Sequence, residues 1–297
     1  MNLGKRKILA TIIVGSMLLA GCTADSSADN DEALEEILET PDNGNQDDPG
    51  SAPEEIIELE GNDYCDDTNQ IHCMLPFPSG AFLSVDNSQD TGYSLSIDGQ
   101  AIPDSRSAVS DNMVILDRLD GFSPSTQIFT AFDEVPNITG MATQFDIEKS
   151  ITESHGSVLL NMDTGQKVFH WIEVDARAQE GEETLLFLRT IEGLDHNASY
   201  AIGLRGLLDT EGNEIDPHDG FRALRDNVET NYEGIEEQRE SYEEMFSSLD
   251  SLGFERDSLQ AAWWFHTAST DSILRDIVMM RDDACLLYTS PSPRDSS

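Results

Sequence analysis

Short apolar runs separated by turn residues dominate the chain between residues 64 and 230. Their β-branched and aromatic content, with Gly, Asn, Asp and Ser between them, is typical of strands. The runs are Phe82–Val85, Tyr93–Ile97, Met113–Leu116, Gln127–Phe132, Val158–Met162, Val168–Val174, Thr184–Arg189 and Tyr200–Leu204. Short strands at this spacing predict a mainly β fold, with an antiparallel Ig-like β-sandwich over residues 64–230.

Turn and proline residues refine this prediction. Asp163-Thr-Gly165 lies between two runs and predicts a hairpin, in which Gly165 supplies a positive φ. Pro76 and Pro78 forbid helix and each removes a backbone donor, so we expect the segment Met74–Ser79 to lie along a sheet edge.

The apolar period changes after residue 230. Apolar residues recur at helical spacing from Tyr232 to Leu252, and Gly253 ends the pattern, which predicts one long amphipathic helix. Ser258–Ser269 is apolar and aromatic and predicts a buried strand, followed by a second helix that begins at Thr270 or Asp271 and runs through Arg281. Residues 231–284 are therefore expected to form a helix-strand-helix junction toward another domain.

The N-terminal 21 residues have the layout of a bacterial export signal. Lys5, Arg6 and Lys7 precede the apolar run Ile8–Ala20, which is too short to span a bilayer. Leu19-Ala20-Gly21-Cys22 resembles a lipobox, and that resemblance implies a lipoprotein signal peptide over residues 1–21 and a lipid on Cys22. Thr23 follows Cys22 where Asp would retain a lipoprotein in the inner membrane, so in a Gram-negative cell the resemblance implies the outer membrane or cell surface. An ordinary signal peptide with a chance cysteine is the alternative.

The charge of the chain excludes one class of partner. There are 58 acidic and 17 basic residues, for a formal charge of −41, which repels nucleic acid and anionic lipid headgroups. Contact with a membrane is therefore expected through the lipid anchor. Residues 22–63 are acidic, contain no Lys or Arg, and predict a disordered tether. Beyond the signal the only lysines are Lys149 and Lys167, a bias that fits either a saline habitat or an ordinary acidic secreted protein.

Two cysteines predict a disulfide. Cys65 and Cys73 are close in sequence in a chain with an export signal, so we expect them to pair. Metal binding by these thiols with His72 lacks a fourth ligand at suitable spacing. The acidic run that begins at Asp209 does not follow a calcium-loop pattern, and a solvated turn is the favoured interpretation. The sequence thus predicts no metal and no cofactor.

No catalytic motif is found in the sequence. Gly-x-Ser-x-Gly, a P-loop, a dinucleotide fingerprint and His-Glu-x-x-His are all missing, and the six histidines are scattered singly. Ser154, His155 and Ser157 are the nearest approach to a nucleophile and base, but sequence neighbours on a loop rarely face each other. His266, beside Trp263 and Trp264, is expected to belong to an aromatic core. No catalytic residue is predicted.

The residues from Cys285 to Ser297 differ from the rest of the chain. The string Cys285-Leu-Leu-Tyr-Thr-Ser-Pro-Ser-Pro-Arg-Asp295 resembles the translation of a transposon end and adapter used in sequencing libraries. Residues 285–297 are therefore interpreted as an artefact, with the natural reading frame cut near Ala284. A natural Pro/Ser-rich tail is the alternative.

Several stretches carry a family resemblance. They are Cys73-Met-Leu-Pro-Phe-Pro-Ser-Gly-Ala-Phe-Leu, Leu119-Asp-Gly-Phe-Ser-Pro-Ser-Thr-Gln-Ile, Asp163-Thr-Gly, Leu208-Asp-Thr-Glu-Gly-Asn, Phe221-Arg-Ala-Leu-Arg-Asp and Ala262-Trp-Trp-Phe-His-Thr-Ala-Ser with Met280-Arg-Asp-Asp. Together they resemble the N-terminal region of secreted bacterial lipase-like and esterase-like proteins, the type that precedes virulence-factor lipase domains. The stretch from Leu186 to Leu194, followed by that from Ser199 to Ile215, also resembles the closing half of bacterial Ig-like domains.

The resemblance implies a division of labour along a longer chain. In that family the nucleophile serine belongs to a following α/β-hydrolase domain, so none of its catalytic residues can be assigned here. We therefore expect a lipid-anchored, cell-surface accessory domain that is inactive alone and whose partner is a missing downstream hydrolase domain. The alternative is a non-enzymatic surface binding or adhesion lipoprotein, with a glycan or another protein as ligand.

Overall fold

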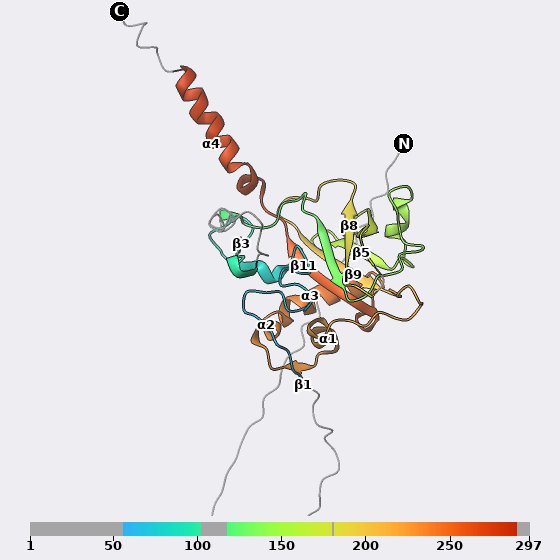
Figure 1. Ribbon diagram of the computed structural model, residues 1–297. Coiled ribbons are helices and arrows are strands. Elements are labelled where there is room, and N and C mark those ends of the chain that lie inside the picture. The colour runs from blue at the N-terminus through green and yellow to red at the C-terminus, as the bar shows by residue number, and fades with distance from the viewer. Residues whose placement is uncertain (1–55, 102–117, 180, 290–297) are drawn as a thin grey trace, which may run out of the picture. The chain divides into compact units, whose positions relative to one another are not determined.

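The computed structural model describes residues 56–101, 118–179 and 181–289 (Figure 1). The chain divides into two units after Gly50, and every described residue lies in the second unit. Several predictions concern residues outside these ranges, namely the signal peptide of residues 1–21, lipidated Cys22, most of the tether of residues 22–63, the strand Met113–Leu116 and the end of the segment 285–297.

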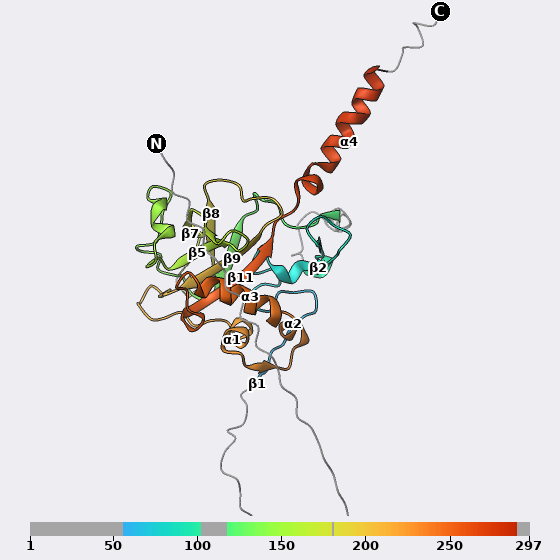
Figure 2. The same ribbon diagram turned by 180° about the vertical axis from the view of Figure 1, so that it is seen from behind.

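Two antiparallel sheets contain most of the strand residues (Figures 1 and 2). One has the order β11-β9-β5-β6 and the other the order β4-β8-β7. Their strands are β4 (Ile128–Phe132), β5 (Ser157–Asn161), β6 (Gln166–Lys167), β7 (His170–Val174), β8 (Thr184–Thr190), β9 (Ser199–Arg205) and β11 (Leu259–His266). The described fold is therefore mainly β and antiparallel, as the sequence predicts.

Two further strand pairs and four helices complete the described part. Strands β2 (Leu83–Val85) and β3 (Tyr93–Leu95) form an antiparallel hairpin, and β1 (Ile56–Ile57) pairs in parallel with β10 (Glu229–Thr230). The helices are α1 (Asp219–Asp226), α2 (Glu233–Glu236), α3 (Arg239–Asp250) and α4 (Thr270–Thr289). Short 3-10 turns lie at Gly80–Phe82, Gly99–Ala101, Ile147–Ile151 and Arg256–Ser258.

The larger sheet is covered on both faces. Successive residues of a strand point to opposite faces, and in β5 both sets are buried. Val158 lies beside Gly203 of β9, on the side where Leu249 of α3 packs. Ser157 points the other way and contacts His170 of β7. Helix α3 therefore packs on one face of this sheet, and the second sheet packs on the other.

The proline-containing segment and the hairpin turn confirm their predictions. Phe77 exchanges two backbone hydrogen bonds with Phe129, at 2.9 and 2.8 Å, and so extends the second sheet at the edge formed by β4. The bonds before Pro76 and Pro78 are both cis. Gly165, with φ of 70°, closes the turn between β5 and β6.

The predicted long helix from Tyr232 to Leu252 is wrong in one respect, because the structure breaks it into α2 and α3. The amide N–H of Gln238 bonds the carbonyl of Ile235 in a tight turn, at 3.1 Å. The Gly234 carbonyl, which a continuous helix would offer to that N–H, instead accepts from the Gln238 side-chain amide at 3.0 Å. A side chain thus replaces a backbone donor and ends the first helix.

The ends of the predicted regions also differ from the structure. Ile57 and Leu59, within the predicted tether, are buried in the core, and the Leu59 amide donates to Asn231 Oδ1 at 2.7 Å. Helix α1 lies inside the segment 64–230 that was predicted as sandwich alone. The predicted strand over 258–269 is present as β11, and the helix after it extends beyond Arg281 to Thr289.

Candidate functional site

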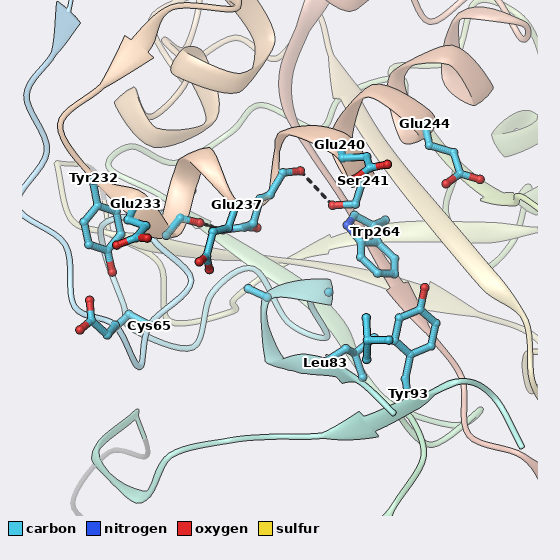
Figure 3. Close-up of a pocket in the computed structure, with 16 residues that line it drawn as sticks. Cys65, Leu83, Tyr93, Tyr232, Glu233, Glu237, Glu240, Ser241, Glu244 and Trp264 are labelled. Carbon is cyan, nitrogen blue, oxygen red and sulfur yellow. Dashed lines mark hydrogen bonds between the residues drawn. The ribbon is translucent and has the colours of Figure 1, made fainter. Parts of the chain in front are cut away.

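An open groove of about 600 Å³ lies between the α2–α3 segment and the β2–β3 hairpin (Figure 3). Figure 3 shows Glu233 and Glu237 on the helical side, Leu83 and Tyr93 on the hairpin side, and Trp264 of β11 between them. We refer to this surface as the acidic groove.

The α2–α3 segment supplies most of the charge of the acidic groove. Glu233 of α2, Glu237 between the two helices, and Glu240 and Glu244 of α3 all line it. Asp63 adds a fifth carboxylate. Among the described residues that line the groove there is no Lys, Arg or His, so its electrostatic potential is negative.

The aromatic wall of the groove depends on one glycine. A Cβ at Gly80 would lie 2.3 Å from the Trp264 ring, so only glycine lets the indole lie across this backbone. The Tyr93 ring lies 6.1 Å from that of Trp264 and 5.2 Å from that of His266. Rings beside carboxylates suit a cation, or the hydroxyl groups and C–H faces of a sugar.

The predicted disulfide is present, and one of its cysteines, Cys65, lines the acidic groove. Cys65 and Cys73 are bonded, with an S–S distance of 2.01 Å. Beneath this loop the buried Asp66 carboxylate accepts from Thr68 Oγ1 at 2.6 Å and from Ser79 Oγ. Burial raises the pKa of Asp66 to about 6, although these hydrogen bonds lower it. Asp66 therefore holds the loop to the segment that carries Gly80.

Of the predicted serine and histidine group, the structure brings Ser157 and His155 together and adds His170. Ser157 Oγ lies 3.1 Å from His155 Nδ1 and 2.7 Å from His170 Nε2. All three side chains are buried, and none of Ser157's surface is exposed. Ser154 instead borders a groove on the outer side of His155.

Every ring nitrogen of this cluster has a partner. His155 Nε2 accepts from the Ala142 amide at 2.8 Å, and His170 Nδ1 lies 2.8 Å from the Val168 carbonyl. Burial lowers the pKa of His155 and lowers that of His170 to about 4, so both rings are neutral at pH 7. Ser157 can then donate to His170, and the cluster ties the two sheets together.

A second serine and histidine pair joins residues that the sequence analysis did not connect. Ser199 Oγ lies 2.9 Å from His266 Nδ1, and His266 Nε2 lies 3.0 Å from Asn197 Oδ1. The antiparallel pairing of β9 with β11 places Ser199 opposite His266, a relation between residues distant in the sequence. The bonds have the order of a nucleophile, a base and an orienting group. Within the described ranges, however, none of these residues lines the acidic groove, the groove beside His155 or the groove beside Phe77. His266 is 6% exposed, in agreement with the core position that was expected.

The residues considered for metal binding are used otherwise. The Cys65 and Cys73 thiols are oxidised, and exposed His72 lies 3.8 Å from Glu183. Asp209 accepts from the Asn213 amide and side chain, both at 2.8 Å, within a turn. Across the described ranges, no group of three or more His, Cys, Asp or Glu side chains is placed to hold a metal ion. Within the same residues, no helix is both long and apolar enough to cross a bilayer.

The residues of the acidic groove could have been found only in part from the sequence. The glutamates at helical spacing were visible, but Trp264 and Tyr93 come from separate strands. No family model, curated protein or solved structure matches the chain.

Proposed function

We propose that this chain is an exported, lipid-anchored, non-catalytic accessory domain of a larger ester hydrolase, displayed at the outer membrane or cell surface. The lipobox ending at Cys22 and the acidic segment after it support the anchor and tether. The resemblance of residues 64–284 to the N-terminal region of lipase-like proteins supports the accessory role. We also propose that the two sheets are arranged as in an Ig-like sandwich. Their antiparallel strands and the one core that they share support this part of the proposal.

One observation carries the accessory role. Helix α4 follows β11 and exposes several large apolar side chains. An apolar surface of this kind usually marks a contact with another domain or protein. These side chains are Leu274, Ile277, Met279 and Met280, which are 44, 61, 59 and 66% exposed. A helix that leads from this domain into the next would bury them there. The Asp120–Ser269 and Arg118–Asp276 contacts fix its first turns to the domain.

The non-catalytic part of the proposal is supported by the burial of Ser157. An ester cannot reach a side chain with no exposed surface, and both neighbouring imidazoles are engaged. Ser199 is more accessible but lies outside the grooves of the described residues. Hydrolysis by this chain alone is therefore not expected.

Two measurements test this function. Cells that express the chain are labelled with radioactive palmitate, and the label should enter the wild type but not Cys22→Ser. The purified chain is then assayed on short-chain p-nitrophenyl esters, with Ser157→Ala and Ser199→Ala as matched variants. Turnover that one of these variants abolishes would show that the domain is itself a hydrolase.

A non-enzymatic binding or adhesion module is the second candidate, and the acidic groove favours it. Trp264 and Tyr93 offer ring faces beside five carboxylates, a combination that suits glycans or basic peptides. Binding of a glycan or basic peptide that Trp264→Ala removes, in an intact chain without a hydrolase domain, would favour this candidate.

A further inference from the structure

A second groove, of about 650 Å³, is lined by Ile71, His72 and Cys73 at the end of the disulfide loop and differs in chemistry from the acidic groove. The loop closed by Cys65–Cys73 and the proline segment form one wall, and the outer face of β4 and β8 forms the other. The side chains that define it are Ile71, Met74, Leu75, Phe77, Phe129 and Leu185. We call it the apolar groove.

The strand register builds an aromatic row along the apolar groove. Phe77 pairs with Phe129, and Phe129 pairs with Phe187, so the three rings follow one another across the sheet. Their centroids are 5.7 and 5.6 Å apart. Phe77, Phe129 and Leu185 are each partly exposed, so the groove presents apolar surface to solvent.

The size and lining of the apolar groove are those of a site for a small apolar ligand. Such sites enclose roughly 300 to 1,000 Å³ and combine mainly apolar walls with a few polar groups. Here the polar groups are His72 and Gln100, both exposed at the rim. The Gln100 amide can donate a hydrogen bond to a carbonyl oxygen.

The negative charge of the chain favours apolar ligands whose headgroup is uncharged over those whose headgroup is anionic. No Asp or Glu is found among the described residues that line the apolar groove, whereas five line the acidic groove. The chain as a whole carries −41, and Glu183 lies 3.8 Å from His72 at the rim. An anionic headgroup is therefore repelled, and an uncharged one is not. A second copy of this chain is disfavoured as occupant for the same reason.

We infer that the apolar groove binds the acyl chain of an uncharged ester, with the ester group at the Gln100 rim. A role of this binding in ester hydrolysis rests on the proposed function, whereas the binding of an acyl chain does not depend on it. An accessory domain that holds the acyl chain would raise the local concentration of ester near a hydrolase domain of the same chain.

The test is a fluorescence titration with the uncharged dye N-phenyl-1-naphthylamine. The whole chain with Cys22→Ser is exported, so that the disulfide can form, and is purified without detergent. Competitors are methyl decanoate and decanoate, which share an apolar tail and differ in headgroup charge. Leu185→Glu and Met74→Glu place a carboxylate in the apolar groove from two different walls, and Leu83→Glu makes the same change in the acidic groove.

We expect one saturable site, displaced by methyl decanoate at a concentration about tenfold or more below that needed of decanoate. Both apolar-groove variants should bind the dye about tenfold more weakly, because a buried carboxylate is costly, and Leu83→Glu should bind as the wild type does. Cooperative thermal unfolding of each variant verifies the fold, and Met74→Glu remains informative if Leu185→Glu does not fold.

Three results would overturn the inference: no saturable binding by the wild type, equal competition by decanoate, or equal loss in Leu83→Glu. Dimer formation that blocks the dye, seen by sedimentation velocity, would show instead that a second copy occupies the groove. If the dye does not bind and the gene continues into a hydrolase domain, this inference is wrong but the proposed function is not. If the dye binds and the gene encodes no hydrolase domain, the accessory role is wrong but the ligand site remains.

Discussion

Two buried groups, His170 and Asp66, have opposite pKa shifts, so their effects on the free energy of unfolding should partly cancel as the pH changes. His170 keeps a neutral ring until its pKa of about 4, whereas an unfolded histidine takes up its proton near 6.5. The stability that this provides is complete above pH 6.5 and is lost as the pH falls toward 4. Asp66 behaves oppositely, because its folded pKa of about 6 lies above the ordinary 3.8. The stabilisation from protonating it is complete below pH 3.8 and is lost as the pH rises through 6.

The sizes follow from about 1.4 kcal/mol for each unit of pKa difference. Between pH 7 and pH 5, the titration of His170 should lower the free energy of unfolding by about 2 kcal/mol, and that of Asp66 should raise it by about 1 kcal/mol. The wild type should therefore lose only about 1 kcal/mol from this pair. His155 and His266, whose pKa values burial also lowers, add to the loss.

Asp66→Asn separates the two contributions, because the amide keeps the shape of the side chain and does not titrate. Urea unfolding followed by tryptophan fluorescence at pH 7, 6 and 5 should show about 1 kcal/mol more acid destabilisation in this variant than in the wild type. His170→Gln should lose about 2 kcal/mol less than the wild type between pH 7 and pH 5, because it lacks the His170 titration. NMR titration of the wild-type histidines gives the pKa values directly. Identical pH slopes in the wild type and Asp66→Asn would refute the assignment of a raised pKa to Asp66.

Three further predictions concern stability. Replacing Cys65 and Cys73 by serine should lower the free energy of unfolding by about 2 to 3 kcal/mol, since the disulfide closes a loop with a sequence separation of 8. Urea unfolding of the wild type under reducing conditions should show the same loss, and an unchanged urea midpoint would contradict this prediction. Gly220→Ala should lower the free energy of unfolding by about 2 to 3 kcal/mol despite the helical preference of alanine, because the new Cβ would lie 1.9 Å from the Asp67 carbonyl oxygen. Gly99→Ala is the matched control: its new Cβ meets no atom within 4 Å, so the free energy of unfolding should change by less than about 0.5 kcal/mol. Raising NaCl from about 0.05 to about 1 M should raise the thermal midpoint, because salt screens the repulsion within a chain of charge −41; a falling midpoint would show that self-repulsion is not a main destabilising term.

Local patterns predicted the strands well, because each depends on a short stretch of sequence. The runs that became β4, β5, β7, β8 and β9 match the observed strands to within two residues at either end. Turn chemistry located the hairpin at Gly165, and the prolines placed Phe77 at a sheet edge. The disulfide followed from the closeness of Cys65 and Cys73 in sequence.

Features that depend on contacts between distant residues were not predicted. The break before α3 depends on the Gln238 side chain replacing a backbone donor to Gly234, which apolar periodicity does not reveal. Ser199 meets His266 only because β9 pairs with β11. The Leu59 amide donates to Asn231, which is far along the chain. Periodicity therefore predicted the elements, while packing decided which polar groups meet.

The sequence of the genomic locus after the codon for Ala284 tests the accessory role most directly. The reading frame should continue without the adapter-like residues 285–297 and encode an α/β-hydrolase domain with Gly-x-Ser-x-Gly between a strand and a helix. A stop codon directly after Ser297, or further β-sandwich repeats in place of a hydrolase, would contradict it.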